Sequence, residues 1–464
     1  MSRMNREDTI AAIATAGGEG GVGIIRISGP GAKGVGSFIF SPARPTKAGP
    51  RPARLYYGAI KNPDTGKTAD TGYMVFFKAP FSYTGEDTVE LHLHGGQLIL
   101  QKTLNLVLRF GARLAEPGEF TKRAFLNGKL DLTQAEAVSD LIRAKTEKAY
   151  ASAMGRLEGR LSKRINSIKG KLLDLAARIE AELDFSEDEI EGLKESELSA
   201  TLNEAAIELQ TLLASYDEGR VLKEGLKVLI LGRPNAGKSS LLNVLLKEER
   251  AIVTHVPGTT RDVIEEVLSI KGIPMRLMDT AGLRDTEDMV ESVGIKRAKE
   301  RAATADLILY VVDALSTGYD EDLSLIRSFE QDGKKIIVVA NKSDLLNRGG
   351  AESPISAFKP RNVVFVSALK ETGIDSLEGE IVGSFSKIGL AERDPSELIT
   401  SIREKESLER ALKSLEAAMA AEGMPREFVA TDLRQSITRL GEITGEVTTE
   451  DILDKIFSTF CVGK

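Results

Sequence analysis

LKVLILGRPNAGKSS, residues 226–240, is the stretch that decides the fold of this chain. Its first six residues form a mostly apolar run, which predicts a buried parallel strand. Residues 232–239 match the P-loop pattern, and a helical pattern over 240–245 follows directly. In such a loop, glycines let the backbone wrap a triphosphate, and N–H groups at the helix N-terminus point at its oxygens. The alternative is a Gly-rich turn that matches by chance, and the strand–loop–helix context argues against it.

Three further short motifs each follow a predicted strand, where doubly wound sheets place their ligands. In DTAG (279–282), Asp279 could hold Mg²⁺ through water and the final glycine N–H could sense a γ-phosphate. In NKSD (341–344), the carboxylate of Asp344 can accept hydrogen bonds from N1–H and the 2-amino group of guanine, a donor pair that adenine lacks. In SAL (367–369), a backbone N–H could reach guanine O6. The order of these motifs predicts a GTP-binding domain with a Ras-like, doubly wound α/β sheet.

The hydrolytic step requires groups beyond the P-loop. The motif predicts that Lys238 bridges the β- and γ-phosphates and that Ser239 binds Mg²⁺. Ras-type GTPases carry a glutamine directly after the DTAG-like motif, and it orients the attacking water. The residue here is Leu283, which can neither donate nor accept a hydrogen bond, so another group must act. Candidates are the acids that follow, with ordinary surface acids as the alternative: Glu287, Asp288 and Glu291.

Composition narrows the class of protein. The chain has 464 residues and 42% hydrophobic content, enough for two or three globular domains. Its net charge of −7 predicts no large electrostatic footprint on nucleic acid, although it does not exclude an RNA substrate. The single cysteine, Cys461, precludes an intrachain disulfide and fits a reducing cytosol. No apolar run reaches about 18 residues and no signal peptide is evident, so we expect a cytoplasmic protein without a membrane span.

Residues 1–125 predict an α+β domain. The expected strands are residues 9–14, 22–27, 73–78 and 88–94, and a helix is expected over 97–109. The glycines at 17–21 favour a β-turn over a phosphate loop, because neither Lys-Ser nor a helix follows them. His92 and His94 point to one face of a strand, which leaves a metal site open as the alternative to surface histidines.

Helical periodicity dominates from about residue 131. Apolar residues recur at spacings of three and four from Leu157 to Leu183, which is typical of a bundle or coiled-coil helix. The acidic run 184–189 favours a solvated loop over a cation site. Further helices are expected over 196–219, 396–421, 426–440 and 449–460.

These patterns predict a multidomain chain. We expect an α+β domain over 1–125, all-α segments over 126–222 and 385–464, and the GTP-binding domain over 223–384. The favoured architecture joins both all-α segments into one helical bundle domain, with the GTP-binding domain inserted between them. The alternative is two separate helical domains.

Several motifs together carry a resemblance to a known family. They are GRPNAGKSS (232–240), GTTRDV (258–263), DTAGLR (279–284), FCVGK (460–464), GVGIIRISG (21–29), YTGEDTVE (83–90) and PGEFTKRAFLNGK (117–129). With them the chain resembles the MnmE (TrmE) family of bacterial tRNA-modification GTPases over essentially its whole length. One position departs from the family pattern: Val462 stands where isoleucine is expected.

The resemblance implies how GTP is cut. In this family two GTP-binding domains meet face to face, and K⁺ takes the place of an arginine finger. Asn235 resembles the family's K⁺ ligand, joined by the carbonyls of Thr254 and Val256 and by Thr259. Glu291 falls at the catalytic glutamate that orients water, and Thr260 at the switch threonine on Mg²⁺. The residues expected to contact GTP are Asn235, Ala236, Gly237, Lys238, Ser239, Ser240, Thr254, His255, Val256, Pro257, Gly258, Thr259, Thr260, Asp279, Thr280, Ala281, Gly282, Asn341, Lys342, Asp344, Ser367 and Ala368.

The N-terminal domain resembles tetrahydrofolate-binding one-carbon domains. The matching positions are Arg26, Glu90, Lys129 and Lys464, which would surround 5,10-methylene- or 5-formyl-tetrahydrofolate. A glutamate can accept from the pterin N–H edge, and arginine or lysine can pair with the anionic tail. Without the resemblance, these four are ordinary surface charges. Cys461 either serves the chemistry or packs as a small apolar residue.

The resemblance also implies partners. A homodimer would act with the FAD protein MnmG to install a carboxymethylaminomethyl or aminomethyl group at C5 of the wobble uridine of certain tRNAs. The rival hypothesis is a ribosome-assembly GTPase without modification chemistry, but we find no KH-type Gly-x-x-Gly module after residue 384. A membrane-associated iron-transport GTPase is disfavoured because no membrane span is predicted.

Overall fold

The structure, a computed structural model, describes residues 8–44, 49–184, 193–248, 267–278, 299–346, 354–359, 361–386, 394–421 and 423–464. The chain divides into two compact units. The first is built mainly from residues 1–139 and 441–464, and the second mainly from 140–253 and 262–440. Both units therefore combine segments that are distant in the sequence.

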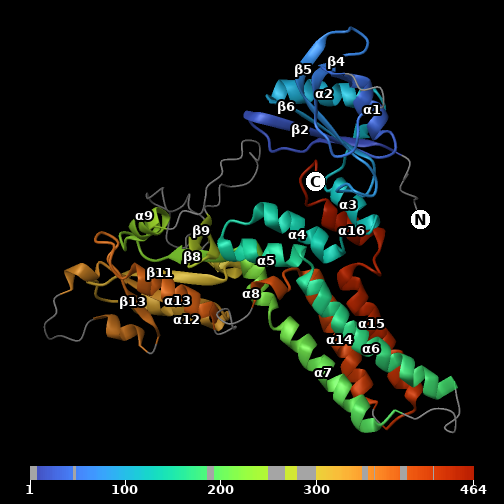
Figure 1. Cartoon of the computed structure of the whole chain (residues 1–464). Helices are drawn as coiled ribbons and strands as arrows, with labels where there is room; N and C mark the ends of the chain where they lie inside the picture. The colour runs from blue at the N-terminus through green and yellow to red at the C-terminus, as the bar shows by residue number, and fades with distance from the viewer. Residues whose placement is uncertain are drawn as a thin grey trace. The chain divides into compact units, whose positions relative to one another are not determined.

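A seven-stranded sheet forms the core of the first unit. Its order is β3-β4-β5-β6-β2-β1-β7, and every pairing is antiparallel except that of β1 with β7. The strands are β1 (Ile10–Ile13), β2 (Gly20–Ser28), β3 (Phe40–Pro42), β4 (Tyr56–Lys61), β5 (Thr68–Phe77), β6 (Thr88–Gly95) and β7 (Arg113–Leu114). Helices α1 (Ala32–Ile39) and α2 (Gln97–Arg109) pack on this sheet (Figure 1). Residues on β6 alternate, so Leu91 is buried in the core while Glu90 and His92 lie on the opposite face.

The predicted strands of this unit and helix α2 are confirmed, but helix α1 is not predicted by the sequence pattern. Its sequence, AKGVGSFI, contains two glycines, which are poor helix formers. Gly36 is required by packing, because a Cβ at this position would come within 2.8 Å of the Val89 side chain. Tertiary contacts with β6 therefore stabilise a helix that local propensity disfavours.

A six-stranded sheet carries the P-loop in the second unit. Its order is β13-β12-β11-β8-β10-β9, and all pairings are parallel except that of β9 with β10. The strands are β8 (Leu226–Leu231), β9 (Val267–Ile270), β10 (Ile273–Met278), β11 (Leu307–Asp313), β12 (Lys335–Asn341) and β13 (Val363–Phe365). Its helices are α9 (Lys238–Glu248), α12 (Asp320–Gln331) and α13 (Ile374–Ser386). The predicted buried parallel strand at 226–231 is confirmed as β8, between β10 and β11.

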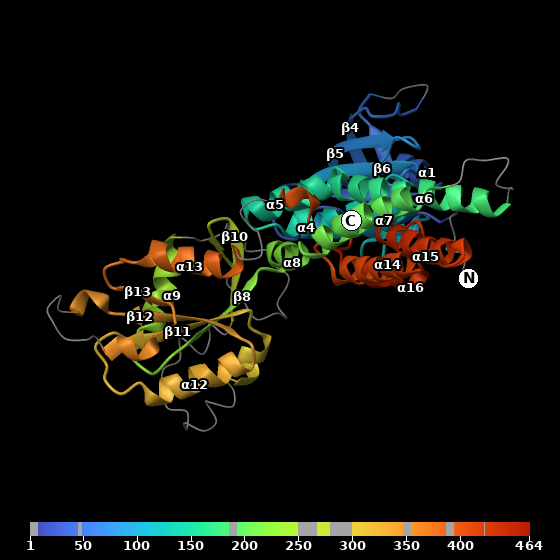
Figure 2. The same ribbon diagram turned by 90° about the horizontal axis from the view of Figure 1, so that it is seen from below.

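A helical bundle makes up the rest of the second unit. Its helices are α5 (Glu147–Leu157), α6 (Arg160–Asp184), α7 (Glu195–Leu213), α8 (Tyr216–Glu224), α14 (Ile402–Ala420) and α15 (Arg426–Thr444). Both views show α6, α7, α14 and α15 side by side (Figure 1, Figure 2). The predicted apolar stripe is buried along α6 from Leu161 to Ile179, whereas Leu183 at its end is exposed. Contacts of α7 with α14 join segments from before and after the six-stranded sheet, so the sheet follows and precedes helices that pack together.

The single helix predicted over residues 196–219 is wrong in part, because α7 ends at Leu213 and α8 begins at Tyr216. Buried Ser215 lies at the break: its hydroxyl donates to the Leu212 carbonyl and accepts from the Ile399 N–H. Serine side chains that bond nearby backbone groups compete with helix continuation. One of the contacts that fix this break comes from Ile399, 184 positions further along the chain. The periodicity of residues 196–219 alone could therefore not predict it.

A buried ion-pair network joins α5, which precedes the inserted sheet in the sequence, to the start of α14, which follows it. The fully buried guanidinium of Arg156 on α5 donates to Asp140 Oδ2 at 2.9 Å and also to Thr400 and Glu404. Glu404 is equally buried, and its carboxylate accepts from the backbone N–H groups of Thr400 and Ser401 at the start of α14. The network therefore holds a helix before the insertion to a helix after it.

The C-terminal helix completes the first unit. Helix α16 (Glu450–Phe457) contacts α3 (Glu119–Leu126), and Lys122 Nζ lies 2.5 Å from Asp454 Oδ1. Phe457 and Phe460 join an apolar cluster with residues of α4 (Leu132–Arg143). The last two dozen residues are thus part of the fold of the N-terminal segment.

Candidate functional sites

The P-loop joins β8 to α9 and has the backbone that a phosphate cradle requires. Gly232 and Gly237 have φ of +145° and +92°, a region that favours glycine. A Cβ on Gly237 would lie 2.1 Å from Asn341 Nδ2, so no side chain fits between the loop and that amide. Asn235 also has positive φ, +63°, at the crest of the loop. The residues therefore fit a loop that wraps an anionic group with its backbone.

Lys238 is the first residue of α9, and its ammonium turns back over the loop. Its Nζ donates to the carbonyls of Gly232 at 2.9 Å and Arg233 at 2.7 Å. Burial lowers the pKa of this lysine from its ordinary value, because it disfavours the charged form. Ser239 and Ser240 follow in the first turn of the helix. A cation and helix N-terminal N–H groups thus meet at one place, which suits a phosphate chain.

One buried amide brings three of the predicted GTP-contacting segments together. Asn341, the last residue of β12, donates from Nδ2 to the Ala236 carbonyl in the P-loop at 3.0 Å. Its Oδ1 accepts from the Ala368 N–H at 3.0 Å. Asp344 accepts from the Ser367 hydroxyl at 2.6 Å, which links the NKSD and SAL motifs a second time. The three motifs therefore form one site at the carboxyl edge of the sheet, as the strand-end rule predicts.

Asp313 is a site residue that the motifs did not predict. It ends β11, and its Oδ2 lies 2.5 Å from the ammonium of Lys342, the second residue of the NKSD motif. Burial disfavours the charged form of Asp313, but the hydrogen bonds from Lys342 and from the Leu315 N–H, together with the Lys342 charge, hold its pKa below the ordinary value. The sequence could have predicted this position, because Asp313 ends an apolar run in the same way that the recognised motifs follow theirs.

Part of the predicted GTP site lies outside the described residues. The residues concerned are Thr254, His255, Val256, Pro257, Gly258, Thr259, Thr260, Asp279, Thr280, Ala281, Gly282, Leu283, Glu287, Asp288 and Glu291. The expected Mg²⁺ contact of Thr260, the K⁺ contacts other than that of Asn235, and the catalytic role of Glu291 stay predictions.

The predicted folate residues Arg26 and Glu90 face each other across β2 and β6. Arg26 Nε donates to Glu90 Oε1 at 2.9 Å, and His92 Nε2 lies 3.3 Å from Glu90 Oε2. The guanidinium also lies over the rings of Tyr83 and Phe120, at 5.4 and 5.7 Å from their centroids. Burial works against ionised Glu90, yet the bonds from His92 and Arg26 keep its pKa below the ordinary value.

The C-terminal residues reach the same region. Val462 bridges to Pro117, and Gly463 lies so close to β1 that a Cβ would come within 2.3 Å of the Ile13 carbonyl. The pKa of Lys464 is lowered first by burial and then by the charge of Arg26, whereas Glu90 acts in the opposite direction. Cys461 is exposed in the same short segment. Of the four predicted folate residues, Arg26 and Glu90 therefore pair directly, Lys464 lies within range of both charges, and Lys129 donates to the Pro80 carbonyl at 3.2 Å.

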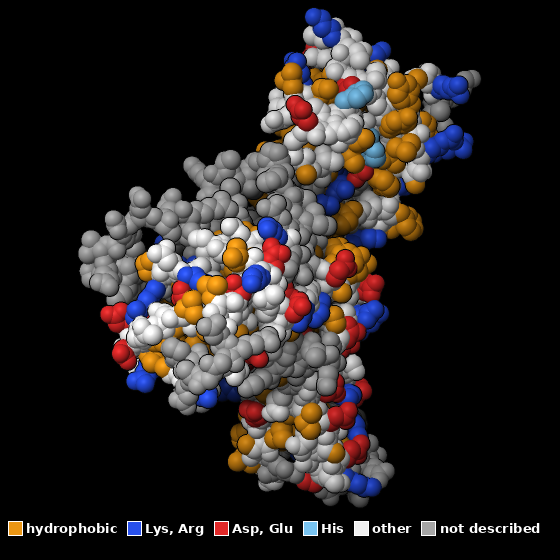
Figure 3. Space-filling model, turned by 90° about the vertical axis from the view of Figure 1, so that its left-hand side faces the viewer, with side chains coloured by type: hydrophobic (Ala, Val, Ile, Leu, Met, Phe, Trp, Pro, Cys, Tyr) orange, Lys and Arg blue, Asp and Glu red, His pale blue; other side chains and the backbone are white. Residues whose placement is uncertain are grey.

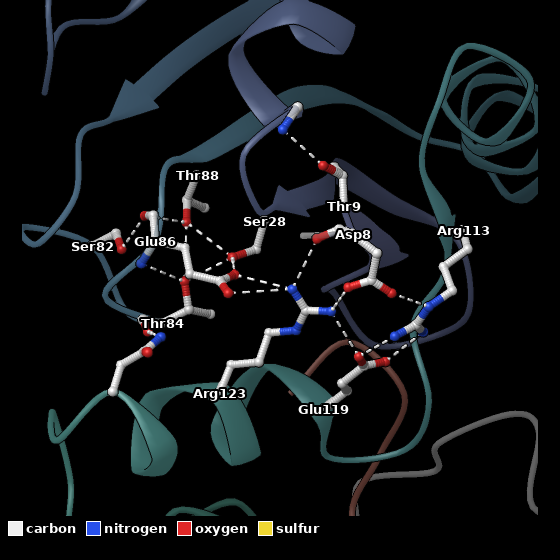
Figure 4. Close-up of polar contacts among 12 residues, drawn as sticks. Asp8, Thr9, Ser28, Ser82, Thr84, Glu86, Thr88, Arg113, Glu119 and Arg123 are labelled. Carbon is white, nitrogen blue, oxygen red and sulfur yellow. Dashed lines mark hydrogen bonds and ion pairs between the residues drawn. The ribbon is translucent and has the colours of Figure 1, made fainter. Parts of the chain in front are cut away.

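A dense polar network holds the loop beside this region. Figure 4 shows Arg123 pointing between Asp8, Glu86 and Glu119, all of which accept from its guanidinium. The Glu86 carboxylate in turn accepts from the Ser28 hydroxyl at 2.8 Å. These bonds fix the turn that contains Tyr83, the residue that stacks on Arg26. No group of three or more His, Cys, Asp or Glu in the described ranges is placed to hold a metal, and His94 pairs with Asp70.

Comparisons with known proteins identify the family. The family model of the MnmE helical domain matches residues 132–461, and the model of the GTP-binding protein TrmE N-terminus matches residues 9–129. The chain belongs to the MnmE family. An MnmE tRNA modification GTPase from Alkaliphilus oremlandii is 46% identical over 461 residues, which cover 99% of each chain. An MnmE from Aquifex aeolicus is also 46% identical, over 98% of this chain and 100% of that one.

A solved structure resembles part of this MnmE family member. The G domain of the T. maritima FeoB iron transporter matches 34% of this chain and 97% of its own, with 26% identity and a TM-score of 0.25. In this chain, no helix among the described residues has the length and apolar character needed to span a membrane. The predicted fold class, an N-terminal TrmE-type domain, a helical domain and a P-loop GTPase domain, is confirmed.

Proposed function

We propose that the chain binds GTP at the carboxyl edge of the six-stranded sheet and hydrolyses it during tRNA modification. The observation that carries the proposal is the buried amide of Asn341, which ties the P-loop to the SAL motif. Asp344 would read the N1–H and 2-amino edge of guanine, Ala368 its O6, and Lys238 the β- and γ-phosphates. Membership of the MnmE family supports the same activity.

The metals belong to the proposal as well. Ser239 and Thr260 would hold Mg²⁺, which neutralises charge on the phosphates. Asn235, with Thr254, Val256 and Thr259, would hold K⁺ at the position where other GTPases insert an arginine. The left-handed backbone of Asn235 at the crest of the P-loop supports the first of these four contacts. Glu291 would orient the attacking water, because Leu283 cannot do so.

We further propose that the N-terminal unit binds a tetrahydrofolate and forms a homodimer. The pairing of Arg26 with Glu90, near Lys464, supports a site with both a carboxylate and cations. Hydrophobic side chains on the surface of this unit support the dimer (Figure 3). The exposed ones include Val22, Leu55, Tyr57, Tyr73 and Leu98. The partner would be MnmG, whose FAD supplies redox chemistry while the folate supplies the carbon added at C5 of the wobble uridine.

The proposal keeps the domain boundaries that the sequence predicts, although residues 126–139 and 441–464 pack in the same compact unit as residues 1–125. They are 1–125 for the N-terminal domain, 126–222 and 385–464 for the helical domain, and 223–384 for the GTP-binding domain. With this organisation, hydrolysis in the inserted domain can be coupled to both helical segments, since the network around Arg156 joins them.

Two measurements test this function. Mass spectrometry of tRNA nucleosides, from a strain lacking the gene and the same strain complemented with it, should show the modified wobble uridine only after complementation. Unchanged nucleosides with altered ribosomal subunit profiles would support the rival ribosome-assembly role instead.

In the purified protein, Glu291→Ala should keep GTP affinity and lose most turnover, and replacing K⁺ by Na⁺ at fixed ionic strength should slow GTP hydrolysis by the wild type. A Glu291→Ala rate within about threefold of wild type, less than 1 kcal/mol, would exclude the assigned glutamate.

A further inference from the structure

An ion-pair brace holds the P-loop from the side of α12. Arg233 is the second residue of the loop, and its backbone carbonyl accepts from the Lys238 ammonium at 2.7 Å. Its guanidinium extends out of the loop to two acidic side chains. Nε lies 3.0 Å from Asp322 Oδ2, and Nη2 lies 2.9 Å from Glu321 Oε2. Both acids belong to the first turn of α12, about ninety positions along the chain.

The two acids differ sharply in environment. The Asp322 side chain is 3% exposed, whereas that of Glu321 is 82% exposed. A second donor holds Asp322 in place, since the hydroxyl of Tyr310 on β11 donates to its Oδ1 at 2.8 Å. Burial raises the pKa of Tyr310, so its hydroxyl stays protonated and continues to donate. Both carboxylate oxygens of Asp322 are therefore engaged, one by the sheet and one by the P-loop.

The different environments of Asp322 and Glu321 decide which of the two contacts of Arg233 is the stronger. A hydrogen bond between a guanidinium and a desolvated carboxylate is stronger than a neutral one and fixes the geometry of both partners. An exposed pair such as Arg233–Glu321 is weakened by solvent and contributes little. The Arg233–Asp322 contact is therefore the one that can restrain the loop backbone.

We propose that Arg233, held by Asp322 and Tyr310, is a positioning residue that fixes the P-loop backbone for the β-phosphate of the nucleotide. Arg233 acts through the loop: its side chain faces α12, and its main chain carries the carbonyl that receives Lys238. This inference rests on the proposed binding of GTP at the loop. It assigns a role to a position between the motif's first glycine and Asn235, where the P-loop pattern admits any residue.

The test compares nucleotide affinities of full-length variants by fluorescence titration in Mg²⁺. Arg233→Ala should weaken GDP and GTP binding by about tenfold, the usual effect of losing one charge-assisted hydrogen bond. Asp322→Asn should cause a similar loss, and Arg233→Lys should recover part of the affinity. Glu321→Ala is the matched control, because it removes the exposed partner of the same guanidinium, and it should stay within about twofold of wild type.

Two further readouts separate positioning from general damage. The preference for GDP over inosine diphosphate, which lacks the 2-amino group, should be unchanged in Arg233→Ala, because Asp344 is untouched. The double variant Arg233→Ala with Asp322→Asn should bind no more weakly than Arg233→Ala alone, since both changes remove one contact. Additive losses, an altered base preference, or wild-type affinity in Arg233→Ala would overturn the inference. A wild-type chain that binds no guanine nucleotide would instead overturn the proposed function, and this inference with it.

Discussion

The most informative perturbation of the fold is Arg156→Met, which removes a fully buried guanidinium from the helical bundle. Methionine fills much of the same volume but leaves the carboxylate of Glu404 buried without its cation. Removing one partner of a buried ion pair costs about 3–5 kcal/mol, because the remaining charge stays desolvated. For a domain of this size, each kcal/mol lowers the melting temperature by roughly 2–4 °C, so we expect a fall of about 6–20 °C.

The assay is differential scanning calorimetry, in which the transition temperature is compared between variants because a multidomain chain need not unfold in two states. Arg178→Ala is the control. It removes an ion pair with Glu197 between α6 and α7 that is exposed to solvent and therefore contributes little to stability. The double variant Arg156→Met with Glu404→Gln should regain part of the loss, because the neutral amide leaves no buried charge without its cation at this position and its oxygen can still accept from the Thr400 and Ser401 N–H groups. A transition temperature of Arg156→Met equal to that of the control, or a loss in the double variant equal to the sum of the two single losses, would contradict this expectation.

Two further results are expected. Gly237→Ala should lower the affinity for GDP, measured by titration, by about 30-fold or more. The causes are the strain of a φ near +92° and the loss of the hydrogen bond between Asn341 and the Ala236 carbonyl. The control Gly170→Ala on α6, where a Cβ would meet no neighbour, should leave the affinity unchanged. Acid should destabilise the first unit through Glu119. Burial disfavours its charged form, but the bonds from Arg113, the Glu116 N–H and Arg123 together hold its pKa below the ordinary 4.5. The stabilisation is therefore complete above pH 4.5 and is lost as the pH falls through the lower pKa of the folded state. Melting curves between about pH 6 and pH 3 should show this slope in wild type and a flatter one in Glu119→Gln; equal slopes would contradict it.

The sequence predicts most of the GTPase fold because each of its signals is local. The β8 strand, the P-loop and α9 lie within 23 consecutive residues, and the two guanine motifs each follow an apolar run. The strand-end rule then predicts that these loops meet, as the bonds of Asn341 confirm.

The features that could not be predicted depend on contacts between distant residues. Arg233 meets Asp322, Arg156 meets Glu404 and Ser215 meets Ile399, and no spacing rule connects these pairs. Similarly, the helical pattern of α1 is obscured by glycines, and the packing reason for one of them, Gly36, is its close approach to Val89 on β6. That Lys464 lies near enough to Arg26 to be affected by its charge is expected from the family resemblance and not from any periodicity.

The packing of α16 on α3 has a consequence for how the chain folds as it is made. The partners of Phe457 and Phe460 in α3 and α4 leave the ribosome about three hundred residues before these rings do. At roughly 5–20 residues per second, this apolar surface waits on the order of 15–60 s for its cover. The apolar surface of α3 and α4 is therefore exposed in the growing chain until α16 has been synthesised and can cover it.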